Sequence, residues 1–140
     1  MTNDDKPSSP FVIRRWSFVG PGSSLRRSVG YALVGIARAF RAERNLRLQS
    51  LLALAATGLG LWLGLTPVEW ALLALVYGFV LFAELTNTAI ELAVDLAAPR
   101  PDPLAAAAKD VAAGAVLVAA LASALVGLLL FGPRLLGLVR

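Results

Sequence analysis

The chain has 140 residues, of which 58% are hydrophobic and 16% are charged, and its mean hydropathy is +0.73. Soluble domains average about 45–50% apolar and about 25% charged residues, so water is not the expected solvent for most of this surface. Cysteine and histidine are both absent, which excludes disulfides, thiolate metal sites and a histidine nucleophile, and leaves acid–base chemistry to carboxylates, lysine or tyrosine.

The N-terminal part divides into a polar tail and an amphipathic helix. Residues 1–24 are rich in Ser, Pro, Gly and Asp, which predicts a disordered cytoplasmic tail. In residues 25–47 one face of the predicted helix is apolar, with Leu25, Val29, Ala32, Leu33, Ile36 and Phe40 at helical spacing. The other side carries Arg26, Arg27, Arg38, Arg41 and Arg44. This pattern is typical of a helix that lies in a membrane interface.

Three long apolar segments follow the amphipathic helix. Each reaches the roughly 20 residues needed to cross a bilayer core. Thr66-Pro67 marks a tight turn between the first two, and Pro99, Pro101 and Pro103 mark a short loop before the third. We therefore predict an all-α membrane protein, with one membrane domain at 25–140. It comprises an N-terminal interfacial amphipathic helix plus three transmembrane helices at 48–66, 69–98 and 109–132.

Basic residues near the ends of the spans predict their orientation, because cytoplasmic loops carry the excess of lysine and arginine. Arginines from Arg14 to Arg47 precede the first span, the first connecting loop has no basic residue, and the second holds Arg100 and Lys109. The N-terminus and the second loop should therefore be cytoplasmic. Arg134 and Arg140 then fall on the outer side, against the rule. Basic residues beside membrane spans suit an anionic lipid surface, and we expect no nucleic-acid partner.

One face of the second predicted span collects polar residues at helical spacing, namely Glu84, Asn87, Glu91 and Asp95, bordered by Thr88. A charged side chain at the bilayer centre costs about 2.5–3.5 kcal/mol on insertion scales, so acids inside membrane spans are usually functional. A structural ion-pair network is the alternative. The spans supply no arginine or lysine partner for it, because Arg100 and Lys109 lie at their edges.

Glu43 falls on the apolar side of the amphipathic helix rather than among the arginines. A divalent cation shared with Glu84 or Glu91 would satisfy such an acid. Magnesium fits best, because it takes oxygen ligands and bridges protein carboxylates to substrate phosphates. The alternative is a surface charge on an imperfect helical wheel.

Lys109 is the only lysine beyond the tail, and it lies level with the Asp95 end of the polar face. It could act as a point charge on a phosphate, or simply as a cytoplasmic anchor. The chain has no Walker A motif, Gly-rich phosphate loop or kinase catalytic-loop signature. If this chain is a phosphotransferase, it therefore does not belong to the common soluble classes that carry those motifs.

The polar face belongs to a longer motif, Glu84-Leu85-Thr86-Asn87-Thr88-Ala89-Ile90-Glu91 followed by Val94-Asp95. This motif resembles the signature of the prokaryotic diacylglycerol kinase and undecaprenol kinase family. Ala108-Lys109-Asp110-Val111-Ala112-Ala113-Gly114-Ala115-Val116 is similar to its second signature, and Ala42-Glu43-Arg44-Asn45 to its N-terminal acid site. The resemblance covers about Leu25 to Phe131.

The resemblance implies a homotrimeric lipid kinase of the bacterial inner membrane, with active sites shared between neighbouring subunits and MgATP as phosphoryl donor. By motif position, Glu84 would be the general base, and Glu43 and Glu91 would hold magnesium and belong to the ATP site. Asn87 would support the γ-phosphate site. Lys109 would contact the phosphates, Asp110 the nucleotide, and Asp95 would orient a neighbour. Thr88 is expected to support the substrate site.

The chain departs from the family pattern in the loop before Lys109. Relatives often carry a histidine and an extra basic residue there, where this chain has Asp102-Pro103-Leu104 and four alanines. Contacts from that loop to the nucleotide are therefore not carried over. Two further features resemble the undecaprenol kinase branch more than the diacylglycerol kinase branch: the Arg-Asn after Glu43 and the Glu69-Trp70 pair.

The expected function is ATP-dependent phosphorylation of undecaprenol or diacylglycerol at the cytoplasmic membrane face, giving undecaprenyl phosphate or phosphatidic acid. An acidic stripe on a membrane helix is also what a cation transporter or proton-conducting oligomer needs. That alternative explains Glu84, Glu91 and Asp95, but it gives no role to Glu43 or Lys109. A third alternative, a non-catalytic membrane partner protein, predicts that the stripe tolerates alanine.

Overall fold

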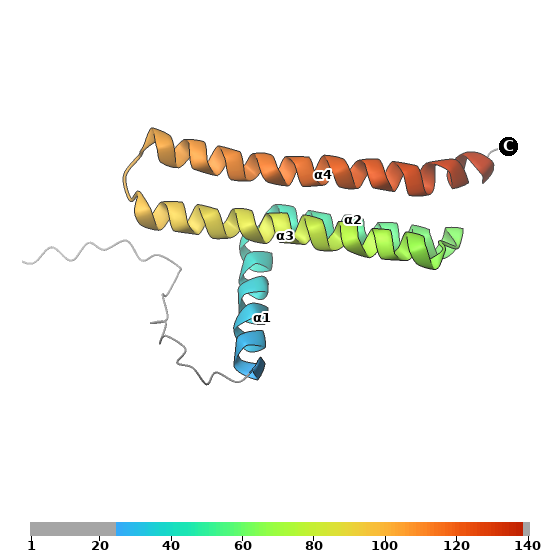
Figure 1. Ribbon diagram of the computed structural model, residues 1–140, viewed down its shortest axis with the longest axis horizontal. Coiled ribbons are helices and arrows are strands. Elements are labelled where there is room, and N and C mark those ends of the chain that lie inside the picture. Colours follow the sequence, from blue (N-terminus) through green and yellow to red (C-terminus); the bar gives the residue numbers. More distant parts are fainter. Residues whose placement is uncertain (1–24, 139–140) are drawn as a thin grey trace, which may run out of the picture. The chain divides into compact units, whose positions relative to one another are not determined.

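The computed structural model describes residues 25–138, which form four helices and contain no strand (Figure 1). The helices are α1 (Leu25–Ala42), α2 (Arg44–Leu63), α3 (Pro67–Ala97) and α4 (Pro103–Leu138). The predicted all-α fold is therefore confirmed, while the predicted tail at 1–24 and Arg140 lie outside the described residues. The chain divides into two compact units, one up to Val34 and one from Gly35 onward.

The amphipathic helix ends earlier than the sequence predicted. α1 stops at Ala42 and α2 begins at Arg44, so the expected helix over 25–47 is interrupted at Glu43. The backbone of Glu43 is extended, with φ −95° and ψ 116°, and its N–H still donates to the carbonyl of Ala39 at 2.8 Å. This extended residue ends α1 and allows α2 to begin as a separate helix.

The turn between α2 and α3 is built from glycine, threonine and proline. Gly64 adopts the left-handed conformation (φ 66°, ψ 58°) that ends many helices, because it has no Cβ to clash. Thr66 then caps α3: its side chain accepts from the Glu69 N–H, while the Glu69 carboxylate accepts from the Thr66 N–H at 2.8 Å. Pro67, with its fixed φ, occupies the first helical position.

α4 begins before the predicted third span. The side chain of Asp102 accepts from the N–H groups of Leu104 at 2.8 Å and Ala105 at 3.1 Å, so it caps the helix directly before Pro103. The alanines that follow have high helix propensity and continue the first turns. Lys109 therefore lies inside α4 rather than at its start.

The last three helices leave most of their apolar surface uncovered. α3 and α4 lie side by side and antiparallel, and α2 makes smaller contacts with both (Figure 1). A small core at the α2–α3 turn contains Leu65, Leu73, Leu130 and Phe131. All three helices are long and apolar enough to cross a membrane, yet only 11–17% of their most apolar stretches is buried. Lipid or further protein must cover this surface, which confirms a membrane protein.

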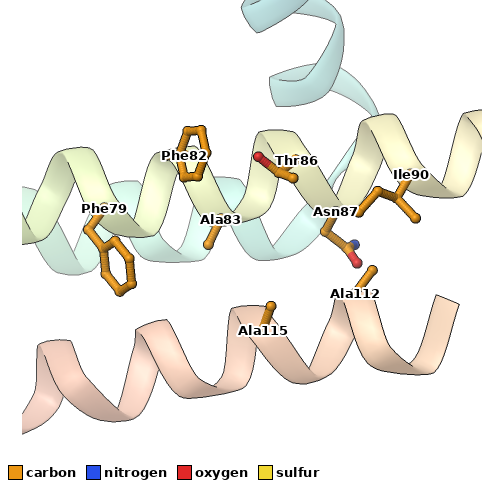
Figure 2. A pocket seen from close by; sticks show the side chains of 8 residues that line it. All are labelled: Phe79, Phe82, Ala83, Thr86, Asn87, Ile90, Ala112 and Ala115. Carbon is orange, nitrogen blue, oxygen red and sulfur yellow. The ribbon is translucent and has the colours of Figure 1, made fainter. Parts of the chain in front are cut away.

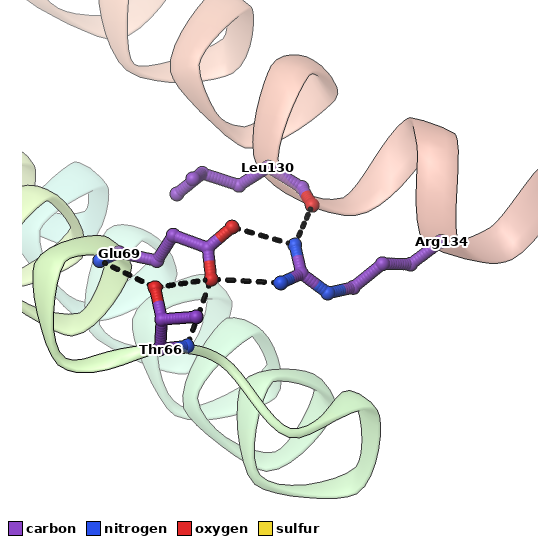
Figure 3. A network of polar contacts seen from close by, with 4 residues as sticks. All are labelled: Thr66, Glu69, Leu130 and Arg134. Carbon is purple, nitrogen blue, oxygen red and sulfur yellow. Dashed lines mark hydrogen bonds and ion pairs between the residues drawn. The ribbon is translucent and has the colours of Figure 1, made fainter.

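A polar network joins the two ends of the chain segment that forms α3 and α4 (Figure 3). The guanidinium of Arg134 binds both carboxylate oxygens of Glu69, each at 2.7 Å, and also donates to the Leu130 carbonyl at 3.0 Å. Such bidentate pairs fix geometry as well as charge. Arg134, which runs against the charge rule for orientation, is therefore neutralised by an acid within the same subunit.

Gly60 of α2 packs against residues of the α2–α3 turn and the start of α3. A Cβ at this position would meet Leu65 Cδ1 at 2.8 Å and ring atoms of Trp70 at 3.1 and 3.3 Å. We expect Gly60→Ala to lower the free energy of unfolding by about 1–3 kcal/mol, because the packed neighbours must shift. Unfolding in detergent by SDS titration measures this change.

Gly58, on the same helix, is the matched control because a Cβ there meets nothing within 4 Å. Gly58→Ala should be neutral or should stabilise by up to about 1 kcal/mol, since alanine favours the helix. Equal destabilisation by both variants would contradict the prediction, because it would show that contacts of the new methyl group with Leu65 and Trp70 do not cause the loss of stability.

Candidate functional site

Glu84 is the most deeply buried charged group among the described residues. Its side chain lies in the middle of α3, and the residue is 2% exposed. Its one side-chain partner in residues 25–138 is an amide of α2: Gln49 Nε2 donates to Glu84 Oε1 at 2.5 Å. The carboxylates of Glu43 and Glu91 lie near enough to act on it electrostatically. Glu84 is thus an acid inside an apolar helix with no basic partner in the part of the chain that the structure describes.

Asn87 and Glu91 form the second polar pair of the stripe. Asn87 Nδ2 donates to Glu91 Oε1 at 2.7 Å, one helical turn along α3. Asn87 Oδ1 is buried and has no hydrogen-bond partner within the described chain. A buried acceptor left unpaired costs about 1–3 kcal/mol, so this oxygen is suited to a ligand or a cation.

Asn87 also lines a shallow groove between α3 and α4, which Figure 2 shows from close by. The other residues that line the groove are Phe79, Phe82, Ala83, Thr86, Ile90, Ala112 and Ala115. Thr86 and Asn87 are thus the polar residues in an otherwise apolar lining. Thr88 does not face this groove, and its hydroxyl donates to the backbone carbonyl of Glu84 at 3.0 Å. Its described contact is therefore with the helix backbone.

Glu43 lies at the break between α1 and α2, where it occupies the N-cap position of α2. Its side chain makes no capping hydrogen bond, and it has no ion-pair partner among residues 25–138. A carboxylate at a helix N-terminus usually binds the free N–H groups or interacts with the helix dipole. Here its oxygens remain available for another ligand.

Lys109 is paired with Asp95 across the loop that joins α3 to α4. Lys109 Nζ lies 2.5 Å from Asp95 Oδ1, and the two side chains are 36% and 64% exposed. Exposed ion pairs stabilise a protein by at most about 1 kcal/mol, so Lys109 can exchange this carboxylate for a phosphate at little cost. Asp110, the next residue, is exposed on α4.

The oxygen donors of this region fit magnesium. Within residues 25–138 no three acidic side chains come together as a metal cluster. Magnesium is usually held by one or two carboxylates together with substrate phosphates and water, so a complete protein cage is not required. Glu91, Glu43 and the unpaired Asn87 Oδ1 carry hard oxygen atoms of the kind that would hold such an ion.

Sequence reasoning missed Gln49, the residue in direct contact with Glu84. It is the one strongly polar side chain in the apolar segment from Leu48 to Leu65 apart from hydroxyl groups. A lone amide in a predicted membrane span could therefore have marked Gln49 as a candidate site residue. The pattern of a single helix does not show which residue of another helix it will meet.

Comparisons with known proteins identify the family of the chain. The family model described as prokaryotic diacylglycerol kinase matches residues 30–131, a range that contains every candidate site residue. The undecaprenol kinase of Bacillus subtilis is 43% identical over 109 residues, which cover 78% of this chain and 89% of that protein.

Two relatives carry the other family name. The diacylglycerol kinase of Synechocystis sp. is 42% identical over 137 residues, covering 96% of this chain and 77% of that protein. The diacylglycerol kinase of Pseudomonas aeruginosa is 36% identical over 92 residues, covering 66% and 75%. The first two identities are nearly equal, so they do not separate the two acceptor lipids.

Proposed function

Because the chain belongs to the prokaryotic diacylglycerol kinase family, and is therefore a membrane lipid kinase with ATP as phosphoryl donor, we propose that it phosphorylates undecaprenol or diacylglycerol. The products would be undecaprenyl phosphate or phosphatidic acid. The reaction takes place at the cytoplasmic face of the bacterial inner membrane, where ATP is found and where the basic residues before α2 are expected to lie.

The burial of Glu84 carries this proposal. A carboxylate that is 2% exposed in an apolar helix, with an uncharged amide as its described partner, has no structural ion pair to explain it. Acids in such positions usually serve function. Its place also suits the acceptor, since Glu84 lies about 16 Å from Asp95 along the helix at 1.5 Å per residue. A lipid hydroxyl reaches below the membrane surface, while ATP approaches from water.

Glu84 acts as the general base in the proposed reaction. The lipid hydroxyl gives its proton to the Glu84 carboxylate as its oxygen forms a bond to the γ-phosphorus of ATP. The bond between that phosphorus and the oxygen bridging to the β-phosphate breaks, and ADP leaves. Phosphoryl transfer needs mainly alignment and charge stabilisation, so few further groups are required.

The phosphates are held by groups at the other end of the stripe. Lys109 leaves Asp95 and pairs with a phosphate, and Asp95 keeps the lysine directed there when no nucleotide is bound. Asn87 supports the γ-phosphate, and Asp110 contacts the nucleotide. Glu43 and Glu91 would hold magnesium, which would supply charge neutralisation on the phosphates when bound.

We propose the family's assembly as well, a homotrimer in which neighbouring subunits complete each site. The uncovered apolar faces of α2, α3 and α4 leave room for such neighbours. Residues 25–140 would form the membrane domain, with the N-terminal segment and the α3–α4 loop cytoplasmic. The basic residues before α2 outnumber Arg134 and Arg140 on the opposite side, which supports this orientation.

Transfer of labelled phosphate from ATP in detergent micelles tests the proposed function. Undecaprenol and diacylglycerol are offered side by side, with and without magnesium. We expect a magnesium-dependent lipid phosphate from at least one acceptor, and the ratio of kcat/KM for the two lipids identifies the substrate.

A folded protein that phosphorylates neither lipid would contradict the proposal. The same preparation, reconstituted in liposomes, then provides a test of the transport alternative. Ion flux that needs no ATP would assign the acidic stripe to a cation path.

A further inference from the structure

We propose that Gln49 is a positioning residue for the general base: its amide holds one oxygen of the Glu84 carboxylate, which leaves the other oxygen to take the proton of the lipid alcohol. The inference rests on the proposed function, since it assigns a role within that same site. It concerns a residue of α2, outside the motifs of α3 and α4.

The contact itself is short and specific. Gln49 Nε2 lies 2.5 Å from Glu84 Oε1, and both groups are removed from water, because Glu84 is 2% exposed and Gln49 Oε1 is buried. A carboxylate on a flexible glutamate side chain has several rotamers. One strong hydrogen bond to a single oxygen removes most of that freedom, and catalysis depends on such alignment.

A second set of hydrogen bonds places Gln49 opposite Glu84. Two turns before Glu84 on α3, the Tyr77 hydroxyl donates to the Ala53 carbonyl at 2.8 Å and lies 3.0 Å from Thr57 Oγ1. Ala53 and Thr57 lie one and two turns after Gln49 on α2. The two helices run antiparallel, so this contact sets the same register that brings Gln49 to Glu84. The helices are therefore already joined without the amide.

The incomplete bonding of Gln49 argues against a purely structural role. Its Oε1 is buried with no hydrogen-bond partner in the described chain. The amide therefore donates a hydrogen bond to the Glu84 carboxylate while its own oxygen receives none. An apolar residue would fill this part of the membrane helix without an unpaired group. An amide also has an advantage over lysine or arginine. A neutral donor stabilises the ionised acid less than a cation would, so the amide orients Glu84 and leaves it a better proton acceptor than a lysine or arginine would.

Gln49→Met tests the inference, because methionine keeps the length of the side chain and removes the amide. We expect kcat for lipid phosphorylation to fall about 10- to 100-fold, as for loss of a hydrogen bond to a charged group. The KM for ATP should stay within about twofold, because Gln49 does not lie at the Lys109 end of the stripe. Tyr77→Phe is the matched control, since it removes a hydrogen bond between the same helices two turns away.

The two variants separate positioning from packing. For Tyr77→Phe we expect a lower midpoint of thermal unfolding and a kcat within about twofold of the wild type. A kcat for Gln49→Met within twofold of the wild type would overturn the inference, as would an equal loss of kcat in both variants. In either case a wild-type protein that makes lipid phosphate leaves the proposed function intact. A wild-type protein that makes none refutes both.

Discussion

Glu84→Gln is expected to lower kcat for lipid phosphorylation by about 10²- to 10⁴-fold, the usual contribution of a general base. The substitution keeps the size of the side chain and removes the group that accepts the proton. The side-chain oxygen that remains can still accept from Gln49 Nε2, so the α2–α3 contact should persist. Initial rates with labelled ATP in mixed micelles measure the effect, and gel filtration in detergent reports whether the assembly is retained.

Glu69→Gln is the matched control, because Glu69 is an acid of the same helix that contacts Arg134 rather than the stripe. This variant should unfold at a lower temperature and keep its kcat within about twofold. Full activity in Glu84→Gln would remove Glu84 from the chemistry. Equal losses in both variants would trace the effect to the helix rather than to the base.

Lys109→Met should reduce kcat/KM for ATP by about 10²- to 10³-fold, the cost of losing one charge-stabilising group in an active site. The ammonium of Lys109 is held at the α3–α4 loop by Asp95, where an incoming phosphate can replace the carboxylate. Methionine retains much of the aliphatic stem but has no charge. Kinetics at varied ATP concentration measure the loss, and unfolding in detergent shows whether the helices remain packed.

Arg100 provides the comparison for Lys109, since both are basic residues near the same loop. A residue that only anchors the loop on the cytoplasmic side contributes a positive charge but makes no specific contact with the nucleotide. Arg100→Met should therefore change kcat/KM for ATP by no more than about threefold. If the two variants lose activity equally, Lys109 serves as an anchor and its phosphate contact is excluded.

Helix content, membrane character and family were predictable from residue order alone. The uncharged stretch after Arg47 and the one after Asp110 are too long and too apolar for soluble helices, and bilayer thickness sets their length. The spacing of Glu84, Asn87 and Glu91 places them on one side of any helix, whatever surrounds it. These features are local, because they depend on helical geometry and on the cost of putting polar groups into hydrocarbon.

Contacts between helices were not predictable in the same way. Three contacts each join residues of different helices: the hydrogen bond to Glu84, the ion pair of Lys109 and the ion pair of Arg134. The backbone break at Glu43 was missed because neither glycine nor proline marks it in the sequence. Periodicity describes one helix at a time and carries no information on register or packing against the next.

The sequence by itself determined which segments are apolar enough to enter the membrane and which acids share one helix face, because apolar length and helical spacing belong to each segment alone. The tertiary structure decided which of those polar groups are satisfied, and by what. Gln49 meets Glu84 because antiparallel packing of α2 against α3 sets their register, and the Asn87 carbonyl stays unpaired because no side chain of residues 25–138 reaches it. Hydrogen bonds need distances near 3 Å, and only packing brings groups from different helices that close.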